Sequence, residues 1–246
     1  MIPYHSIMLN VVFMTLGGLF HLAEHLYPDR TINHRQEFKK DIIAFMLLSL
    51  CGILISTPLI NYYRTLDTSF LYSLHNLNSL TKVLLATLLT DFLNYWIHYF
   101  MHKNAWYWRA HVHHHRVENL YWFSGLRASF GHYFSFIMSR VTVGIVIFNL
   151  SSGELFFYLS IGLITNFYQH TNAKIGHRWI EWILVTPRVH RLHHAANGRR
   201  LKNIATIFSF WDRMFGTYLD PEKNPSNYEL GVKIEKQNEI REIIGF

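Results

Sequence analysis

Histidines recur at short, regular spacings in three separate stretches of the chain. His98 and His102 are four residues apart, and residues 111–115 and 190–194 each contain the pattern His-x-x-His-His. Spacings of three and four place side chains on one side of a helix, so each stretch presents its rings in one direction. Neutral imidazole is a good ligand for iron, zinc, copper and nickel. The pattern predicts a metal site built from His98, His102, His111, His114, His115, His190, His193 and His194.

The number of rings indicates what kind of metal site this is. A structural zinc ion is closed by about four ligands, so eight imidazoles are too many for one ion. His170, at the end of a hydrophobic run, offers a ninth ring. Two metals sharing nine nitrogens keep room for an oxygen species, and neutral ligands leave the charge of the metals largely uncompensated. This donor set suits an oxygen-derived anion bridging two irons better than a hydrolytic zinc site.

Spacing alone is weak evidence for metal binding. His21 and His25 are also four residues apart, but they lie in the first hydrophobic run of the chain. We expect them to be interface residues, with Glu24 as a polar partner. His113 lies within the second histidine stretch, yet on a helix it points away from its neighbours.

The composition indicates a membrane protein. Of the 246 residues, 50% are hydrophobic and only 16% are charged, against roughly 25% charged in a typical soluble domain. The net charge of +7 comes from Lys and Arg that flank the hydrophobic runs, which favours contact with anionic lipid headgroups over nucleic acid. The single cysteine, Cys51, excludes a disulfide framework and a CxxC metal site.

Hydrophobic runs of helical length divide the chain into its expected elements. We predict an all-α integral membrane protein with four to five hydrophobic helices and one domain over residues 1–246, because no repeat or linker interrupts it. The first run lacks the flanks of a cleavable signal peptide, so we expect it to remain as an anchor. The last two runs are short, and they either span the membrane or enter and leave it on the same side. The sequence leaves this choice open. The runs are Ser6 to Tyr27, Ile42 to Ile60, Leu77 to Trp96, Val141 to Leu150 and Glu154 to Phe167.

The positive charges predict the orientation of these helices. Lys and Arg are frequent after the first, third and fifth runs, whereas only Arg64 and Lys82 lie between the second and third. By the positive-inside rule the charge-rich loops are cytoplasmic. All three histidine stretches then lie on the cytoplasmic side, in a histidine-rich helical cap.

Taken together, the histidine stretches resemble the fatty acid hydroxylase superfamily, the integral-membrane sterol desaturase and sphingolipid hydroxylase group. The resemblance covers about residues 90–218. It is carried by the stretches Asp91–His98, Trp108–His115, Thr186–His194 and Trp211–Thr217. It implies a non-haem di-iron centre that uses O2 to hydroxylate or desaturate a C–H bond of a sterol, sphingolipid or fatty acyl lipid. The choice between these reactions and lipids stays open.

The resemblance carries metal ligation onto the eight histidines and His170, and it places a non-ligand residue at His113. Two departures from the family pattern put the transfer of substrate specificity in doubt. Arg127-Ala-Ser-Phe130 stands where members have Arg-x-His-Pro, and Lys174 stands where some have another histidine. His132 or His177 could be an additional ligand.

Polar residues near the histidines are candidates for holding the ligands in place. Asp91 lies two helical turns before His98, and we predict that it accepts a ring N–H from a ligand histidine. The alternative is a helix-packing hydrogen bond to Asn94 or Tyr95. Further candidates for supporting the ligands are Asn172, Asn203 and Asp212.

The reaction would need two electrons from another protein. The chain has neither a cytochrome b5-like haem motif nor a Gly-rich nucleotide fingerprint, so a reductase, ferredoxin or cytochrome partner is expected. An alternative is a membrane metal-binding or transport protein that uses the same histidines without oxygenase activity, although transport sites lie near the membrane midplane. A bis-histidine haem protein is a second alternative, and a haem absorption band would reveal it.

Overall fold

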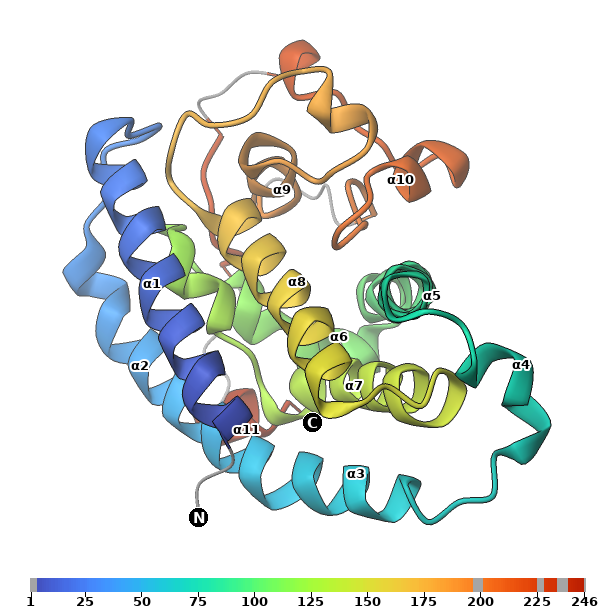
Figure 1. The fold of residues 1–246 in the computed structure, drawn as a ribbon. Coiled ribbons are helices and arrows are strands. Elements are labelled where there is room, and N and C mark those ends of the chain that lie inside the picture. The colour runs from blue at the N-terminus through green and yellow to red at the C-terminus, as the bar shows by residue number, and fades with distance from the viewer. Residues whose placement is uncertain (1–3, 197–200, 225–227, 234–238, 246) are drawn as a thin grey trace.

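The computed structural model describes residues 4–196, 201–224, 228–233 and 239–245, and within these ranges the chain is mostly helical (Figure 1). Backbone pairing between described residues is limited to three isolated bridges, with no strand. The predicted all-α fold is confirmed at this level. The long helices are α1 (Tyr4–Leu26), α2 (His34–Cys51), α5 (Ser79–Lys103), α7 (Phe130–Val141) and α8 (Ser152–His170).

Shorter elements connect the long helices and complete the histidine-bearing end of the molecule. Two of them, α6 (Ala105–His115) and α9 (Pro187–His193), carry the two His-x-x-His-His stretches. The remaining elements are η1 (Gly52–Ser56), α3 (Thr57–Tyr63), η2 (Ser69–Leu71), α4 (Tyr72–His75), η3 (Trp122–Leu126), η4 (Thr142–Ile147), η5 (Ile180–Trp182), α10 (Phe210–Met214), η6 (Pro221–Lys223) and α11 (Glu239–Ile244).

Two helical stretches among the described residues are long and apolar enough to cross a membrane, judged by length and composition. They are Glu37–Tyr63, formed by α2, η1 and α3, and Phe130–Ile147, formed by α7 and η4. The second stretch differs from the sequence prediction, which began a short run at Val141. Because Ser129 caps α7 by accepting a hydrogen bond from the backbone N–H of His132 at 3.1 Å, the helix begins eleven residues earlier. The prediction of four to five membrane helices stays a prediction.

Helix caps set the sharp boundaries that aim the histidine helices. Asn104 ends α5 in an extended conformation, and its side chain accepts hydrogen bonds from the N–H groups of Trp106 and Tyr107 at the start of α6. The chain therefore reverses within two residues between the histidines of α5 and those of α6. Pro187 occupies the first turn of α9, where its missing N–H costs nothing.

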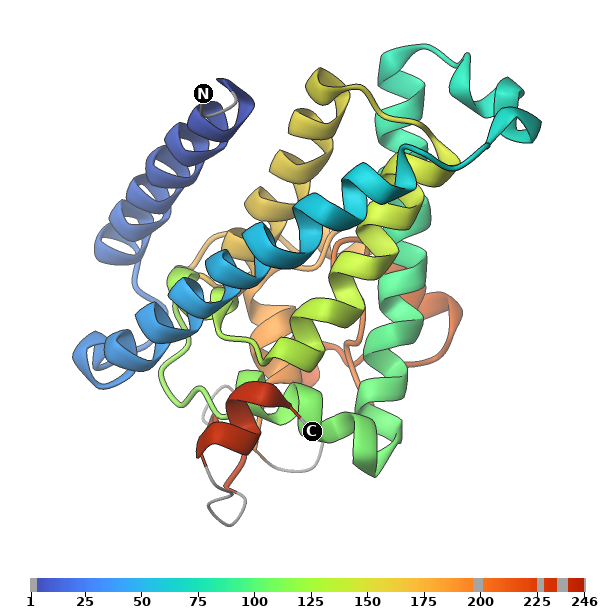
Figure 2. The ribbon, with the colours of Figure 1, turned by 90° about the horizontal axis from the view of Figure 1, so that it is seen from below.

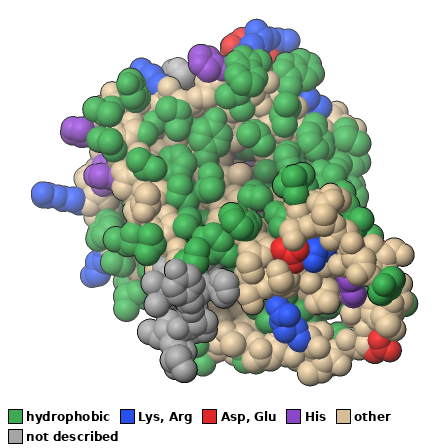
Figure 3. All heavy atoms as spheres, viewed as in Figure 1, with side chains coloured by type: hydrophobic (Ala, Val, Ile, Leu, Met, Phe, Trp, Pro, Cys, Tyr) green, Lys and Arg blue, Asp and Glu red, His purple; other side chains and the backbone are tan. Residues whose placement is uncertain are grey.

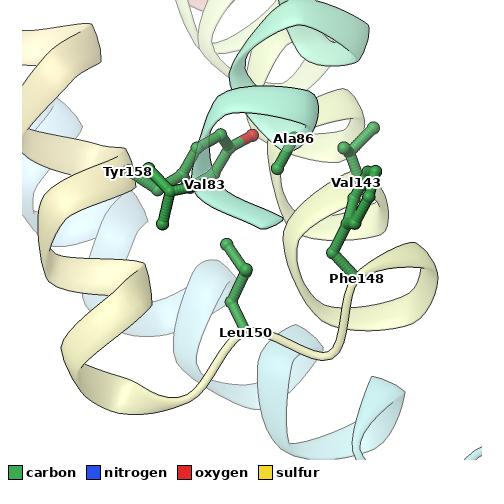
Figure 4. Packing of buried hydrophobic residues seen from close by; sticks show 6 residues of the cluster. All are labelled: Val83, Ala86, Val143, Phe148, Leu150 and Tyr158. Carbon is green, nitrogen blue, oxygen red and sulfur yellow. The ribbon is translucent and has the colours of Figure 1, made fainter. Parts of the chain in front are cut away.

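The long helices pack into a bundle with α8 at its centre. Helix α8 lies between α1 on one side and α5 on the other (Figure 1). Figure 2 shows α2, η1 and α3 continuing as one long helix that crosses α7. Side chains from α5, η4 and α8 form a hydrophobic cluster (Figure 4), whose members are Val83, Ala86, Val143, Phe148, Leu150 and Tyr158.

Large apolar side chains remain on the outside of the bundle. Met14 on α1, Met46 on α2 and Ile53 on η1 are each at least 65% exposed. Hydrophobic side chains cover much of the face seen in Figure 3. Extended apolar patches of this kind are rare on soluble monomers and are expected where helices contact lipid.

Candidate metal centre

Four helices bring all nine predicted ligand histidines together. They come from the end of α5, from α6, from the last residue of α8 and from the end of α9 with its cap. The rings form two groups, in each of which one nitrogen per ring lies within 4.8 Å of the others. The five-histidine cluster consists of His98, His102, His111, His115 and His193, and the four-histidine cluster consists of His114, His170, His190 and His194.

The two His-x-x-His-His stretches are divided between the clusters in opposite ways. On α6, His111 and His115 enter the five-histidine cluster and His114 enters the other. On α9, the outer pair enters the four-histidine cluster and His193 enters the other. In each stretch the two rings that are four residues apart belong to one cluster. The ring three residues after the first belongs to the other cluster, so each helix links both clusters.

Backbone carbonyls fix the tautomer of four rings. Each of these rings has Nδ1 within hydrogen-bond distance of a carbonyl oxygen, which can only accept, so Nδ1 must carry the proton. The neutral ring has one N–H, and Nε2 therefore presents its lone pair. The pairs are His98 with Ile204 at 2.5 Å, His114 with Arg127 at 2.9 Å, His170 with Asn166 at 2.8 Å and His193 with Lys202 at 2.8 Å.

The facing ring nitrogens fit a metal ion in each cluster. Nε2 of His114 lies 3.3 Å from Nε2 of His170, and both carry lone pairs. Two lone pairs repel at this distance unless a cation lies between them. In the five-histidine cluster, Nε2 of His98 lies 2.8 Å from Nε2 of His111. Two nitrogens at right angles around one metal, each about 2.1 Å from it, would be about 3.0 Å apart.

The rings are neutral, as metal ligation requires. Burial disfavours the charged imidazolium and lowers the pKa of His114 and of His193 to about 4. Burial likewise holds the pKa of His115 and His194 well below the ordinary value. At neutral pH these side chains are therefore free bases with lone pairs available.

The remaining histidines lie outside both clusters. His113 is partly exposed, and His21 and His25 are exposed on α1. Of the two possible additional ligands, His177 lines a separate surface pocket, whereas Nδ1 of His132 lies 3.1 Å from Nδ1 of His111. The possible role of His132 or His177 as an additional ligand stays a prediction.

Asp91 does not make the contact that was predicted for it. Its carboxylate accepts hydrogen bonds from the Thr206 hydroxyl, the N–H groups of Ile207 and Phe208, and the Trp211 indole at 2.5–3.0 Å. No bond from a described histidine ring to Asp91 accompanies them. The predicted direct hydrogen bond to a ligand histidine is wrong, because the carboxylate is fully used by the segment that follows the last histidine stretch.

Asp212 and Asn203 support the clusters through the backbone. The Asp212 carboxylate accepts the N–H groups of Ile204 and Ala205 at 2.7 and 3.1 Å, and the Ile204 carbonyl accepts the ring N–H of His98. Asn203 has a φ of 55°, a left-handed conformation that asparagine tolerates. It connects Lys202 to Ile204, whose carbonyls hold two rings of the five-histidine cluster.

Asn172 acts elsewhere in the fold. Its side-chain amide exchanges two hydrogen bonds with the backbone of Arg30, and its own N–H donates to Glu24 at 2.8 Å. Asn172 therefore holds the connection after α1 beside the end of α8. Glu24 also accepts the N–H of Trp122 at 2.7 Å, and it interacts electrostatically with His21, as expected for one of the two histidines of α1.

Arg127 supports a ligand histidine, a role that the sequence pattern did not indicate. Its guanidinium contacts the buried carboxylates of Glu37 and Asp41 at 2.6 and 2.5 Å, and its carbonyl accepts the ring N–H of His114. The available signal was a pair of acids four residues apart at the start of a hydrophobic helix, which needs a buried cation.

A cavity of about 460 Å³ leads to both clusters. Its walls come from α1, α2, α7 and α8 and are mostly apolar, with residues such as Phe45, Leu48, Phe136 and Leu163. Six histidines also line it, and all but His132 belong to the clusters: His98, His111, His114, His132, His170 and His190. The cavity gives an apolar molecule access to the candidate metal centre.

Sequence comparison shows which known proteins this chain is similar to. The chain is 34% identical over 142 residues to alkylglycerol monooxygenase of Xenopus tropicalis, covering 57% of this chain and 31% of that protein. It is 26% identical over 246 residues to ornithine lipid hydroxylase OlsE of Rhizobium tropici, covering 93% and 72%. A third relative, sphingolipid C4-hydroxylase sur2 of Schizosaccharomyces pombe, is 24% identical over 160 residues, covering 63% and 53%.

The first of these relatives is much longer than the matched region, since the chain spans about a third of its length. No solved structure matches the chain significantly. The sequence model of the fatty acid hydroxylase family matches residues 83–217, which include all nine clustered histidines. The chain therefore belongs to the fatty acid hydroxylase family.

Proposed function

We propose that this chain is a membrane-bound di-iron oxygenase that uses O2 to hydroxylate a C–H bond of a lipid. The observation that carries the proposal is the pair of buried histidine clusters, in which lone pairs of His114 and His170 face each other at 3.3 Å. Neutral nitrogen ligands alone suit a redox metal that binds an oxygen-derived anion. Family membership adds three relatives whose names are lipid hydroxylase or monooxygenase.

The positions of the residues indicate what each group of them would do in the reaction. The five-histidine cluster would hold one iron and the four-histidine cluster the other, and the cavity reaches histidines of both clusters. Two bound irons would supply the activation of O2. The carbonyls of Ile204, Lys202 and Arg127 keep the ligand rings in the correct tautomer, which strengthens metal binding.

The cavity would orient the substrate and exclude water. Its apolar walls would hold a lipid chain against the clusters, so that one C–H bond is presented and the others are shielded. Inserting one oxygen atom of O2 and reducing the other to water consumes two electrons and two protons. We propose that a reductase, ferredoxin or cytochrome delivers the electrons at the cytoplasmic side, where the histidine-bearing end would lie.

Isotope labelling tests this function directly. The purified chain, loaded with iron in lipid nanodiscs and given a chemical reductant, should incorporate label from ¹⁸O2 but not from H₂¹⁸O into a lipid alcohol detected by mass spectrometry. His115→Ala should abolish the product, whereas His113→Ala on the same helix should not. Label derived only from water would contradict the proposal, and iron uptake into vesicles without oxidised lipid would favour a transport protein.

A further inference from the structure

Arg140 is a charged residue in an apolar setting that the proposed chemistry does not use. It lies in the interior of Phe130–Ile147, one of the two stretches long and apolar enough to span a membrane. A charge at this depth is costly, and such residues usually face a partner or a pathway. The side chain is half-buried and lines the cavity that leads to the histidine clusters.

The guanidinium of Arg140 lacks an anionic partner within the part of the chain that the structure describes. Only its backbone carbonyl is engaged, by the Tyr158 hydroxyl at 3.2 Å. Lys82 on α5, by contrast, is neutralised by Glu154 at 2.7 Å. The described residues around the cavity include no Asp, Glu or Lys. The permanent charge of Arg140 therefore faces a cavity without a protein anion.

The neighbouring helix leaves space for this guanidinium. Gly162 of α8 also lines the cavity, and a Cβ built on it would lie 3.4 Å from Nη2 of Arg140. A Cβ at this position would be in ordinary van der Waals contact with the guanidinium, and a longer side chain would extend into the space that the guanidinium occupies. Two helices therefore combine to keep one cationic group accessible from the cavity.

The distance from this group to the metal centre is set by both helices. Arg140 follows His132 by eight residues on α7, and His132 contacts His111 of the five-histidine cluster. Gly162 precedes His170 of the four-histidine cluster by eight residues on α8. At 1.5 Å per residue, eight residues of helix span about 12 Å, so on both helices the guanidinium of Arg140 lies about 12 Å along the helix axis from the level of the clustered histidines.

We propose that Arg140 binds an acidic group of the lipid substrate, a carboxylate or a phosphate. This rests on the proposed function, because the cavity is taken as the substrate site. A planar guanidinium binds either anion through paired N–H donors, and the pairing is strong where water is excluded. Anchored in this way, the lipid presents a C–H bond of its chain about 12 Å from its acidic group.

Binding measured without turnover tests this assignment. The full chain in nanodiscs, kept free of O2 and reductant, is titrated with palmitate, palmitoyl lysophosphatidate and the neutral hexadecanol. Arg140→Gln should weaken binding of at least one acidic lipid by roughly tenfold to hundredfold, as expected for loss of a charge-assisted hydrogen bond. Unchanged hexadecanol binding shows that the variant is folded. The exposed Arg35 provides the matched control, and Arg35→Gln should bind all three lipids as the wild type does.

The acidic lipid that loses affinity identifies the group, a carboxylate for palmitate and a phosphate for lysophosphatidate. If Arg140→Gln binds both acidic lipids as tightly as the wild type, the assignment is overturned. A failure of ¹⁸O labelling with Arg140-dependent binding intact would instead remove only the proposed function.

A glycine pair provides a second test that leaves the arginine in place. Gly162→Leu should weaken binding of the same acidic lipid several-fold, because a side chain longer than Cβ would extend into the space of the guanidinium. Gly153→Leu on the same helix is the matched control, since an added Cβ there meets nothing within 4 Å, and it should have no effect. Equal affinity in the two variants would count against the guanidinium as the anchoring group.

Discussion

The five-histidine cluster and the four-histidine cluster are supported by different parts of the chain. Two rings of the five-histidine cluster donate to the carbonyls of Lys202 and Ile204, on either side of a single residue. Two rings of the four-histidine cluster donate to the carbonyls of Arg127 and Asn166, which lie on separate segments. One cluster depends on a short C-terminal segment, and the other depends on the loop beside α2 and on α8.

This difference shows that the histidine pattern alone does not distinguish the two metal sites. The same pattern, His-x-x-His-His, supplies ligands to both clusters from α6 and from α9. What distinguishes the two sites is therefore the carbonyl acceptor behind each ring and the carboxylate that holds that acceptor. Substitutions of residues that are not themselves ligands should weaken one metal site and spare the other.

The largest effect is expected from removing one ring from each cluster. His115 and His194 stack with their ring centroids 4.3 Å apart at the boundary between the clusters. His115→Ala and His194→Ala should each lower bound iron from two ions per chain to about one. Each should reduce hydroxylation at least about a thousandfold, because the two irons act as a unit. Metal analysis and turnover measure both effects, and His113→Ala is the control. Retention of both irons in either variant would show that the ligand assignment is wrong.

Acid should affect both clusters together. In the metal-free protein the pKa of His114 and of His193 is lowered by burial to about 4, against about 6.5 in an unfolded chain. Between these values the unfolded state binds more protons, so the free energy of unfolding rises with pH across this window. The stability is complete above pH 6.5 and is lost towards pH 4, by roughly 3 kcal/mol per ring at most. Denaturant unfolding of the apo protein at several pH values checks this, and a flat profile would contradict neutral buried rings.

Breaking the support behind the four-histidine cluster should destabilise the fold and one site. Arg127→Met leaves the carboxylates of Glu37 and Asp41 buried without their cation. The loss should be about 3–5 kcal/mol in the free energy of unfolding, with weaker binding of one iron. Lys233→Met, which removes an exposed ion pair with Glu229, should leave stability essentially unchanged. Equal losses in the two variants would remove the special role given to Arg127.

A smaller effect, on the five-histidine cluster, is expected from Asp212→Asn. The two carboxylate oxygens of Asp212 accept the N–H groups of Ile204 and Ala205, whereas the amide of asparagine has only one oxygen and an N–H₂ group. One of the two hydrogen bonds is therefore lost, and the segment that holds His98 should loosen. Stability should fall by about 1–3 kcal/mol. Affinity for one iron should fall roughly 10-fold to 100-fold. Chelator competition on this variant and on Arg127→Met resolves which iron leaves first. Loss of the same iron in both would erase the distinction between the clusters.

The sequence predicted which histidines come together, because helical spacing depends only on local pattern. It could not predict their division into two clusters, which depends on how α6 and α9 meet in space. The acceptors behind the rings were also invisible, since Lys202, Ile204 and Asn166 act through carbonyls that every residue has. The role of Asp91 was assigned wrongly because a residue on the same face as His98 was assumed to contact it.

The fold was predictable to the level of helices but not of all boundaries. Apolar runs located the parts of the chain that form α1, α2 and α8. The run placed at Val141 missed most of α7, because residues such as Ser129, His132 and Arg140 interrupt its apolar character. His132 and Arg140 line the cavity and Ser129 caps the helix. The polar residues that obscured the helix in the sequence are therefore the ones that shape the candidate site.

Mössbauer spectroscopy on the ⁵⁷Fe-loaded wild-type chain, combined with protein and iron quantification, tests the central claim most directly. The account predicts two irons per chain in two nitrogen-rich environments, magnetically coupled to each other after exposure to O2. A single uncoupled iron per chain, or binding of zinc alone with iron excluded, would contradict it.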